Sequence, residues 1–305
     1  MKILLLGKNG QVGWELQRAL APLGELTSLD RAPEGGLCGD LADTNGLRET
    51  IRAVRPDVIV NAAAYTAVDK AESEPELAHA VNAAGPALLA EEATRTNAWL
   101  IHYSTDYVFD GAKTGAYVED DTPNPQSVYG ASKLAGEQAI QQSGSRHLIF
   151  RTSWVFAARG GNFAKTMLRL ARERDTLNVV ADQIGAPTSA ELIADVTALC
   201  LQRVYSSEAA ERLSGLYHLV ACGETSWHGY ARHVIADALE RGQKLALTPE
   251  QVNPIATSDY PLPAKRPLNS RLDTTKLRDT FGLALPHWQY HVDRMLEELI
   301  DRQNA

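Results

Sequence analysis

Residues 2–13 of the chain read KILLLGKNGQVG, a short apolar run followed by the three glycines Gly7, Gly10 and Gly13. This pattern predicts a strand near Lys2–Leu6 and a helix that opens near Gln11. Glycines at such a turn permit a tight bend, close approach of the backbone to a diphosphate and close packing of helix on sheet. The amides and the positive dipole end of the helix then face the phosphates. The stretch therefore predicts a dinucleotide-binding turn, with a glycine-rich turn that holds nothing as the alternative.

Short apolar runs alternate with helical patterns through the first two-thirds of the chain, which predicts a parallel sheet covered by helices. The predicted strands lie near Lys2–Leu6, Glu25–Leu29, Val58–Asn61, Trp99–Ser104, His147–Thr152, Leu177–Val180 and Leu216–Val220. The predicted helices lie near Gln11–Ala21, Thr44–Val54, Glu74–Ala84, Pro86–Thr96, Val128–Gln142, Asn162–Arg172 and Ala190–Val204. The sequence thus predicts an α/β fold with a Rossmann-type, doubly wound parallel sheet.

The alternation lapses from about Cys222 onward, where a proline-containing, loop-rich stretch precedes helical patterns at Thr274–Thr280 and His287–Asp301. We therefore predict a dinucleotide-binding domain over residues 1–221 and a smaller C-terminal substrate-binding domain over residues 222–305. The segment near residues 155–175 is an alternative part of the second domain.

Composition narrows the class of protein. The 305 residues are 44% apolar and carry a net charge of -8 with acidic and basic residues interspersed, so we expect no nucleic-acid partner and no acidic-membrane partner. Cys38, Cys200 and Cys222 lie outside any metal spacing, and we expect them to pack as small apolar groups in a reducing compartment. The first apolar run is too short for a signal peptide, and no run approaches the roughly 20 apolar residues of a membrane span. We expect a cytoplasmic protein.

Tyr129 and Lys133 lie four residues apart in the segment YGASK, and hence on one face of the predicted helix. A free tyrosine has a pKa of about 10, and a nearby Lys⁺ favours the phenolate. We therefore expect Lys133 to bring the pKa of Tyr129 toward the working range of an acid–base catalyst. An exposed pair without a catalytic role is the alternative.

Two further strands end in residues suited to a dinucleotide. Asp30 ends the second predicted strand, where a carboxylate accepts the ribose hydroxyls of NAD, whereas the adjacent Arg31 suits a 2′-phosphate. Both NADH and NADPH therefore stay open. The segment Asn61-Ala62-Ala63-Ala64 ends the third strand, and its small side chains let a cofactor lie against the backbone. Close packing alone is the other interpretation of this segment.

The segments GKNGQVG, NAAA, STD and YGASK follow one another at residues 7–13, 61–64, 104–106 and 129–133. In this order they resemble the extended short-chain dehydrogenases/reductases, which share the Gly-x-x-Gly-x-x-Gly spacing. The longer stretches at residues 61–69, 104–109, 151–155 and 266–270 resemble the reductases of this superfamily that act on dTDP-4-dehydrorhamnose. Sugar-nucleotide dehydratases carry Thr-Asp-Glu where this chain has Thr105-Asp106-Tyr107, so dehydration is disfavoured.

The resemblance implies NAD(P)H-dependent reduction of the C4 ketone of dTDP-4-dehydro-β-L-rhamnose to dTDP-β-L-rhamnose, the last step of dTDP-L-rhamnose synthesis for bacterial surface polysaccharide. It implies a catalytic role for Thr105, Tyr129 and Lys133. The expected cofactor contacts are Gly7, Gly10, Gln11, Val12, Gly13, Asp30, Arg31, Asp40, Leu41, Ala63, Ala64, Tyr65, Tyr103, Tyr129 and Lys133. The expected substrate contacts are Thr105, Asp106, Trp154 and Arg266.

Plainer interpretations of several of these residues stay open. Trp154 is also compatible with a core position, Asp106 with a turn cap and Asp40 with a solvated loop acid. Arg266 suits the dTDP diphosphate because a guanidinium makes bidentate phosphate contacts. An ordinary surface charge is the alternative for Arg266.

Glu15, Glu191 and Glu298 lie on three separate predicted helices, and a cluster of carboxylates favours a hard cation such as Mg²⁺. Some reductases of the family form metal-bridged dimers through matching glutamates, so the resemblance implies a homodimer that holds Mg²⁺. Solvated surface acids are the alternative.

Two other function classes remain. One is a non-catalytic regulatory subunit of the same fold, like the β subunit of methionine adenosyltransferase. The other is a sugar-nucleotide epimerase, which retains its nicotinamide. Consumption of NAD(P)H distinguishes the reductase from both.

Overall fold

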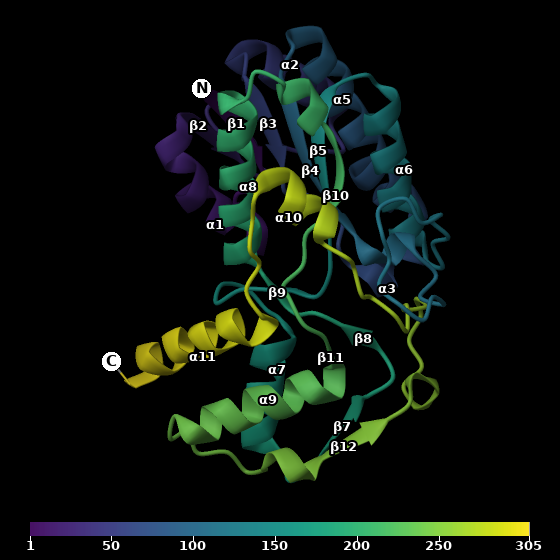
Figure 1. The fold of residues 1–305 in the computed structure, drawn as a ribbon, viewed down its shortest axis with the longest axis vertical. Helices are drawn as coiled ribbons and strands as arrows, with labels where there is room; N and C mark the ends of the chain where they lie inside the picture. The colour runs from purple at the N-terminus through teal and green to yellow at the C-terminus, as the bar shows by residue number, and fades with distance from the viewer. Residues whose placement is uncertain (305) are drawn as a thin grey trace.

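The computed structural model describes residues 1–304, and within them a six-stranded parallel sheet forms the upper half of the molecule (Figure 1). The strands run in the order β10-β5-β4-β3-β1-β2. Their bounds are β1 (Lys2–Leu6), β2 (Glu25–Leu29), β3 (Val58–Asn61), β4 (Trp99–Thr105), β5 (Arg146–Thr152) and β10 (Gly215–His218). The order reverses at β1, because the chain leaves β1 for β2 and then crosses back to β3 on the other side. Open parallel sheets bind ligands at the carboxyl ends of the strands at such a reversal.

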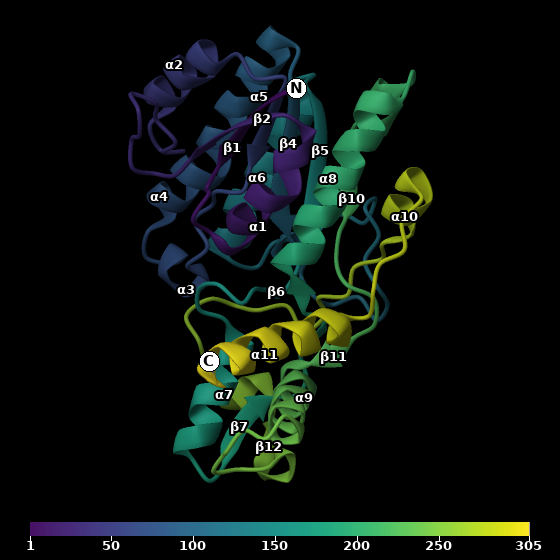
Figure 2. The same ribbon diagram turned by 90° about the vertical axis from the view of Figure 1, so that its left-hand side faces the viewer.

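Both faces of the sheet are covered, which explains the continuous apolar runs (Figure 2). Ile3 and Leu5 pack on the side of α1 (Gln11–Leu20) and α8 (Ala190–Ser206). Leu4 and Leu6 pack on the opposite side. The helices of that side are α2 (Thr44–Val54), α5 (Gly85–Thr96) and α6 (Val128–Gln142). The predicted doubly wound α/β fold is confirmed.

The elements below the sheet form a smaller group (Figure 1). Its helices are α7 (Phe163–Glu173), α9 (Trp227–Glu240) and α11 (Trp288–Asn304). Its short strands are β6 (Val155–Phe156), β7 (Leu177–Val180), β8 (Ile184–Gly185), β9 (Thr188–Ser189), β11 (Thr225–Ser226) and β12 (Val252–Ile255). Between β12 and α11 the chain returns to the sheet, where α10 (Thr275–Phe281) packs beside β10 and α8. The division of the chain near residue 221 stays a prediction.

The remaining short elements connect these parts. They are the helices α3 (Val68–Ala71) and α4 (Pro75–His79), the π-helix Ala80–Ala84 and the single 3₁₀ turns Ala21–Leu23, Asp106–Val108, Ala210–Leu213, Pro249–Gln251 and Thr257–Asp259. The single helix predicted over Glu74–Ala84 is therefore divided, and its second part is wound as a π-helix that runs directly into α5.

Three other expectations need correction. The strand Leu177–Val180 does not join the main sheet, because it pairs with β12. The chain from Cys222 onward contains the regular helix α9, which the sequence interpretation missed. Its signal was present, since the side chain of Ser226 caps the helix and the buried positions recur at helical spacing. Cys200 is buried, but Cys222 is exposed, so the expectation that every thiol is packed is wrong.

No helix within residues 1–304 has the length and apolar character that crossing a membrane requires.

Candidate active site

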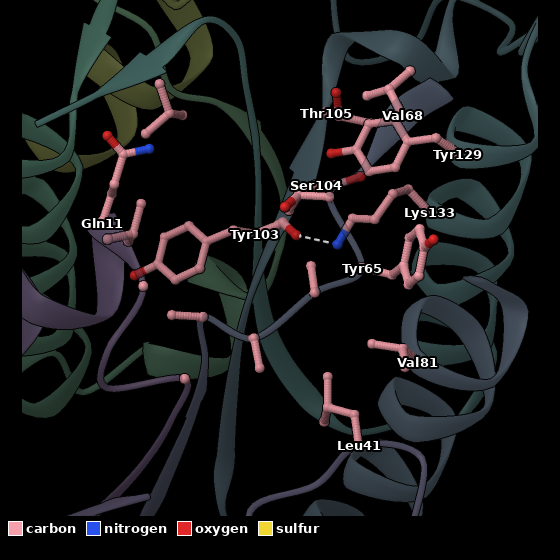
Figure 3. A pocket seen from close by; sticks show the side chains of 18 of the residues that line it. Gln11, Leu41, Tyr65, Val68, Val81, Tyr103, Ser104, Thr105, Tyr129 and Lys133 are labelled. Carbon is pink, nitrogen blue, oxygen red and sulfur yellow. Dashed lines mark hydrogen bonds between the residues drawn. The ribbon is translucent and has the colours of Figure 1, made fainter. Parts of the chain in front are cut away.

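A cleft of about 1070 Å³ opens at the carboxyl ends of the strands, on both sides of the point where the strand order reverses (Figure 3). It brings together Thr105, Tyr129 and Lys133, the three residues expected to be catalytic. It is also lined by every residue expected to contact the cofactor except Gly13. The sequence motifs therefore converge on one cavity, although they lie far apart along the chain.

The glycine turn brings two backbone segments close together. Gly7 has a φ of +86°, and a Cβ atom there would lie 2.7 Å from the amide nitrogen of Ala63. A Cβ atom on Gly13 would lie only 1.9 Å from the carbonyl oxygen of Gly7, so Gly13 packs α1 against the turn and does not line the cleft. Helix α1 begins after Gly10 without a side-chain cap. Its amino end is therefore open toward an anionic ligand.

Acidic and basic groups meet where a dinucleotide ribose would lie. Asp30 accepts hydrogen bonds from the side chain of Asn9 and from the backbone N–H of Arg31, the latter at 2.8 Å. Asp40 accepts the backbone N–H of Ala42 at 3.0 Å. Asp30, Arg31 and Asp40 all line the cleft, which therefore offers carboxylates for ribose hydroxyls as well as a guanidinium for a 2′-phosphate.

Helix α6 positions the catalytic pair. Ser127 caps the helix by accepting the N–H of Gly130 at 3.1 Å, and Tyr129 and Lys133 follow one turn apart. Thr105, at the end of β4, donates its hydroxyl hydrogen to Asp106 Oδ1 at 3.1 Å and accepts the N–H of Tyr107 at 3.2 Å. These contacts fix the Thr105 hydroxyl and the Asp106 carboxyl on the wall that faces Tyr129.

The electrostatics of Tyr129 differ from the sequence-based expectation. Burial raises the pKa of Tyr129 to about 12, the Thr105 hydroxyl opposes this rise, and the charge of Asp106 adds to it. Lys133 instead donates a hydrogen bond to the backbone carbonyl of Tyr103 at 2.6 Å (Figure 3). Burial also lowers the pKa of Lys133 to about 8. The expected lowering of the pKa of Tyr129 by Lys133 is therefore wrong for this structure, because desolvation of the phenolate dominates.

Asp106 is 2% exposed, and burial raises its pKa to about 6. Within the described residues, four buried side-chain atoms that line the cleft have no hydrogen-bond partner. They are Gln11 Oε1, Ser104 Oγ, Asp106 Oδ2 and Thr152 Oγ1. Buried polar atoms are almost always hydrogen-bonded, so these atoms suit a polar ligand in the cleft.

A second cleft of about 1330 Å³ shares Tyr107 and Trp154 with the first one. Trp154 has a φ of +49° and stacks on Trp227, with ring centroids 3.7 Å apart and planes at 16°. It is partly exposed and lines both cavities, so the core interpretation of Trp154 is wrong. The basic residues of the second cleft are Arg169, Arg174, Lys265 and Arg266.

Arg266 is not an isolated surface charge. Its two terminal nitrogens lie 3.0 and 2.7 Å from the carboxylate oxygens of Asp69. Asp69 belongs to α3, which follows the Ala-rich segment of the first cleft, so this pair joins the boundaries of the two cavities.

The three glutamates considered for metal binding lie together. Glu15, Glu191 and Glu298 line a separate cavity of about 750 Å³. Burial raises the pKa of Glu15, and the charges of the other two glutamates add to this rise. However, Glu15 also pairs with Arg18, and Glu191 with Arg294. Among the residues that the structure describes, no group of three or more His, Cys, Asp or Glu residues could hold a metal ion.

Sequence reasoning missed several polar residues that support the site. Asn82 accepts the N–H of Tyr65 at 2.8 Å and donates to the carbonyl of Tyr65 and to Ser132 Oγ, both at 3.0 Å. It therefore fixes the Tyr65 loop against α6. His102 lies 3.3 Å from the Lys133 nitrogen. The available signal was a polar residue within an otherwise apolar run, such as His102 in the strand Trp99–Thr105.

The profile of the family described as the RmlD substrate binding domain matches residues 1–300. The chain belongs to the RmlD family. The dTDP-4-dehydrorhamnose reductase of Salmonella typhimurium strain LT2 is 55% identical over 299 residues, which cover 98% of each chain.

Solved structures of the RmlD family agree with the fold. The dTDP-4-dehydrorhamnose reductase of Clostridium acetobutylicum superposes with a TM-score of 0.86, at 33% identity over 100% of both chains. The enzyme from Bacillus anthracis, solved in complex with NADP, gives a TM-score of 0.83 at 32% identity, covering 97% of this chain and 99% of that one.

Proposed function

We propose that this member of the RmlD family reduces the C4 ketone of dTDP-4-dehydro-β-L-rhamnose to dTDP-β-L-rhamnose with NADPH or NADH. The observation that carries this proposal is the convergence of Thr105, Tyr129 and Lys133 on a cleft that also contains the glycine turn. A relative with 55% identity over nearly the whole chain is a dTDP-4-dehydrorhamnose reductase, which supports the same activity.

The first cleft fits a nicotinamide dinucleotide. Gly7, Gly10 and the open amino end of α1 would hold the diphosphate, and Asp30 or Arg31 would meet the adenosine ribose. Lys133 and Tyr129 would lie beside the nicotinamide end. The bound cofactor supplies the hydride that reduces the C4 carbon.

Tyr129 supplies the proton. Because the pKa of Tyr129 is about 12, the phenol is protonated at neutral pH and can donate to the C4 oxygen as that oxygen becomes an alkoxide. Thr105 can donate a second hydrogen bond to the same oxygen once its hydroxyl hydrogen turns away from Asp106 Oδ1, since the hydroxyl lies on the wall that faces Tyr129. The phenolate left behind then takes a proton from its surroundings, and Lys133 is the nearest ionisable amine on the same helix face.

The sugar nucleotide extends from the first cleft into the second. Asp106 and Trp154 would contact the deoxysugar, because the carboxyl of Asp106 has an unused buried oxygen and the ring of Trp154 lines both cavities. Arg266 would lie near the dTDP diphosphate, since a guanidinium recognises phosphate oxygens through paired hydrogen bonds. The surrounding lysine and arginines supply the local positive charge that a protein of net charge -8 needs for an anionic substrate.

Three finer expectations belong to the same proposal. Cofactor preference is modest, because Asp30 and Arg31 act in opposite directions on a 2′-phosphate. The protein acts in the cytoplasm, where nucleotide sugars are made. It forms a homodimer in which a divalent cation such as Mg²⁺ is held between two copies near Glu15, Glu191 and Glu298. These residues form no metal site within the described part of one chain, so a second copy would have to supply further ligands. The shared cavity supports this arrangement, as does the mutual repulsion of the three carboxylates, which a cation would relieve.

The decisive experiment is an assay of the purified protein with dTDP-4-dehydro-L-rhamnose and either NADH or NADPH. The proposal expects one cofactor oxidised for each dTDP-rhamnose formed. Net conversion of a sugar nucleotide by a tightly held cofactor that is not consumed would identify an epimerase instead. Cofactor binding without turnover would identify a regulatory subunit.

A further inference from the structure

A buried hydrogen-bonded chain lies directly behind Lys133, and the proposed reaction assigns no role to its other two members. It runs from Asn61, at the end of β3, through His102 in β4 to the amine nitrogen of Lys133 in α6. Asn61 and His102 are each 1% exposed, and Lys133 is 2% exposed. The three side chains are therefore removed from solvent, and the direction of each hydrogen bond has an energetic consequence.

The backbone sets the direction of this chain. Asn61 Oδ1 accepts the backbone N–H of Ala63 at 3.2 Å, and a backbone N–H can only donate. The amide group of Asn61 is thereby oriented so that its Nδ2, a donor, faces His102 Nδ1 at 3.1 Å. His102 Nδ1 must accept this hydrogen bond, so the proton of the neutral imidazole sits on Nε2.

That tautomer directs an N–H at Lys133. His102 Nε2 lies 3.3 Å from the Lys133 nitrogen, which also donates to the carbonyl of Tyr103 at 2.6 Å. An ammonium group has no lone pair and cannot accept the Nε2–H, whereas a neutral amine accepts it and still donates to Tyr103. The contact therefore favours the amine over the ammonium.

We propose that His102 is a positioning residue whose Nε2–H, fixed by Asn61, stabilises the neutral amine of Lys133 and so makes Lys133 able to release a proton at the working pH. When Lys133 has released its proton toward the Tyr129 phenolate, its lone pair accepts the Nε2–H, and the amine later regains a proton from water. No group is oxidised or reduced in this step, and each proton that is transferred has a named donor and acceptor.

The charges around Lys133 agree with this role. Desolvation is the larger influence and lowers the pKa of Lys133 to about 8, while Glu137 on the same helix acts in the opposite direction. Glu137 is itself bound to Arg151 at 2.6 Å, which limits its effect on Lys133. The pKa of His102 is well below its ordinary value, first because of burial and then because of Lys133, so His102 stays neutral.

The remaining ionisable neighbours do not supply a competing acceptor. Tyr129 lies one turn before Lys133 and is protonated at neutral pH, because burial raises its pKa to about 12. Tyr65 lies beside Lys133 in the cleft (Figure 3). Its hydroxyl donates a hydrogen bond to Glu74 at 2.7 Å. His102 is therefore the ionisable side chain that meets the Lys133 nitrogen within hydrogen-bond distance in the described part of the chain.

The test is a pH titration of Lys133 in the cofactor-free protein, monitored through the ¹³Cε NMR signals of labelled lysines. The Lys133 signal is the one that disappears in Lys133→Met. His102→Gln places a carbonyl oxygen, an acceptor, where Nε2–H stood. We expect it to raise the titration midpoint of Lys133 by about one pH unit. His147→Gln is the matched control, since His147 lies at the opposite end of the sheet and should leave Lys133 unchanged. An unshifted Lys133 in folded His102→Gln would overturn the proposal.

Two measurements remain decisive if His102→Gln does not fold. In Asn61→Asp the carboxylate still accepts the N–H of Ala63, but it has no hydrogen to donate to His102. His102 Nδ1 then carries the proton and donates it to the carboxylate, which leaves Nε2 as an acceptor. The titration midpoint of Lys133 should therefore rise in this variant as well. In the wild-type protein, ¹⁵N signals of the imidazole should show a protonated Nε2 and an unprotonated Nδ1 for His102. The reverse assignment would overturn the proposal without any variant.

The consequence for catalysis rests on the proposed function. In His102→Gln, the pH above which kcat falls should be higher by about one pH unit. At neutral pH, kcat should fall about tenfold, with little change in KM for the sugar nucleotide. A role limited to folding would lower kcat at every pH and leave that limit in place. The NMR titration needs no substrate, so it tests the role of His102 independently of the proposed function. If His102→Gln shifts the titration midpoint of Lys133 but the wild-type protein reduces no ketone, the proposed function is wrong and the role of His102 stands.

Discussion

The two terminal nitrogens of Arg266 lie 3.0 and 2.7 Å from the two carboxylate oxygens of Asp69, although 197 positions separate these residues in the chain. The pair connects the loop before residue 268, on the second cleft, to α3 beside the first cleft. It also lowers the pKa of Asp69, since the guanidinium stabilises the carboxylate.

Replacement of Arg266 separates its two roles. Arg266→Gln should raise KM for the sugar nucleotide by about tenfold or more, because a charge-assisted contact to the diphosphate is lost. The free energy of unfolding should fall by at most about 1 kcal/mol, since the ion pair with Asp69 is partly exposed. Steady-state kinetics and urea denaturation measure these effects. An unchanged KM would leave Arg266 with the role of joining the two clefts alone.

Removal of the Tyr129 hydroxyl tests the proton donor. Tyr129→Phe keeps the ring that packs edge-on against Tyr107 but removes the proton, so turnover should fall by roughly 10²-fold or more. Tyr205→Phe is the matched control, because the Tyr205 hydroxyl bonds to the carbonyl of Asp57, away from the cleft. Near-normal turnover by Tyr129→Phe with intact cofactor binding would remove Tyr129 from the mechanism.

The raised pKa of Asp106, about 6, gives a stability prediction with a definite sign. A carboxyl that is easier to protonate in the folded state stabilises the fold below its unfolded pKa of about 4, and this contribution is lost as the pH rises through about 6. Asp106→Asn should therefore raise the free energy of unfolding at pH 7.5 by about 1–3 kcal/mol and flatten its change between pH 4 and 6.

Urea denaturation across this pH range provides the measurement for Asp106. Asp110→Asn is the control of opposite sign, because hydrogen bonds led by the N–H of Ala112 lower the pKa of Asp110, and its contribution is lost only as the pH falls. A less stable Asp106→Asn at pH 7.5 would show that its carboxylate is well solvated or paired in the free protein. We also expect Asp106→Asn to lose turnover, since the deoxysugar contact is altered.

Cofactor preference depends on two adjacent residues. Asp30→Ala should raise the ratio of kcat/KM for NADPH to that for NADH by about tenfold, because a negative charge no longer faces the 2′-phosphate. Arg31→Ala should lower the same ratio. Asp57→Asn, at the opposite end of the sheet, serves as the control for a lost acid. An unchanged ratio in Asp30→Ala would show that this side chain does not meet the ribose.

The dependence of dimer formation on a divalent cation is measurable as a change in molecular mass in solution. Light scattering should give a dimer in the presence of Mg²⁺ and a smaller species after treatment with a chelator, and Glu191→Ala should remain the smaller species in both conditions. Glu211→Ala, which removes an acid outside this cavity, is the control. A mass unaffected by chelator and by Glu191→Ala would leave these glutamates paired with Arg18 and Arg294 as the structure has them.

Local patterns in the sequence were enough to specify the sheet and the order of its motifs. Apolar runs bounded by glycine and by helical patterns specified most strands of the sheet to within a residue or two, because burial of both sheet faces demands continuous hydrophobicity. The carboxyl ends of parallel strands lie at the same edge of a sheet. Because each of these motifs follows a predicted strand, Gly7, Ala63 and Thr105 are assigned to one edge from the sequence alone.

Other features depended on contacts between distant segments. The helix Trp227–Glu240 was missed despite a clear cap, because it follows a loop-rich stretch and its apolar face is completed only by packing with α7 and α11. The pairing of β7 with β12 joins strands 75 residues apart, as the register of Asn178 with Asn253 shows, and such pairing leaves no local signal.

The properties of the acid–base groups were decided by the tertiary structure alone. Spacing placed Tyr129 and Lys133 on one helix face, and from spacing alone a lysine is expected to lower the pKa of a neighbouring tyrosine. The fold instead buries both groups and directs the Lys133 nitrogen to the carbonyl of Tyr103 and to His102. Desolvation then raises the pKa of Tyr129 and lowers that of Lys133. The amino-acid sequence decides which chemical groups are present, but burial and the partners that folding supplies decide their protonation, because the energy of a charge depends on everything packed around it.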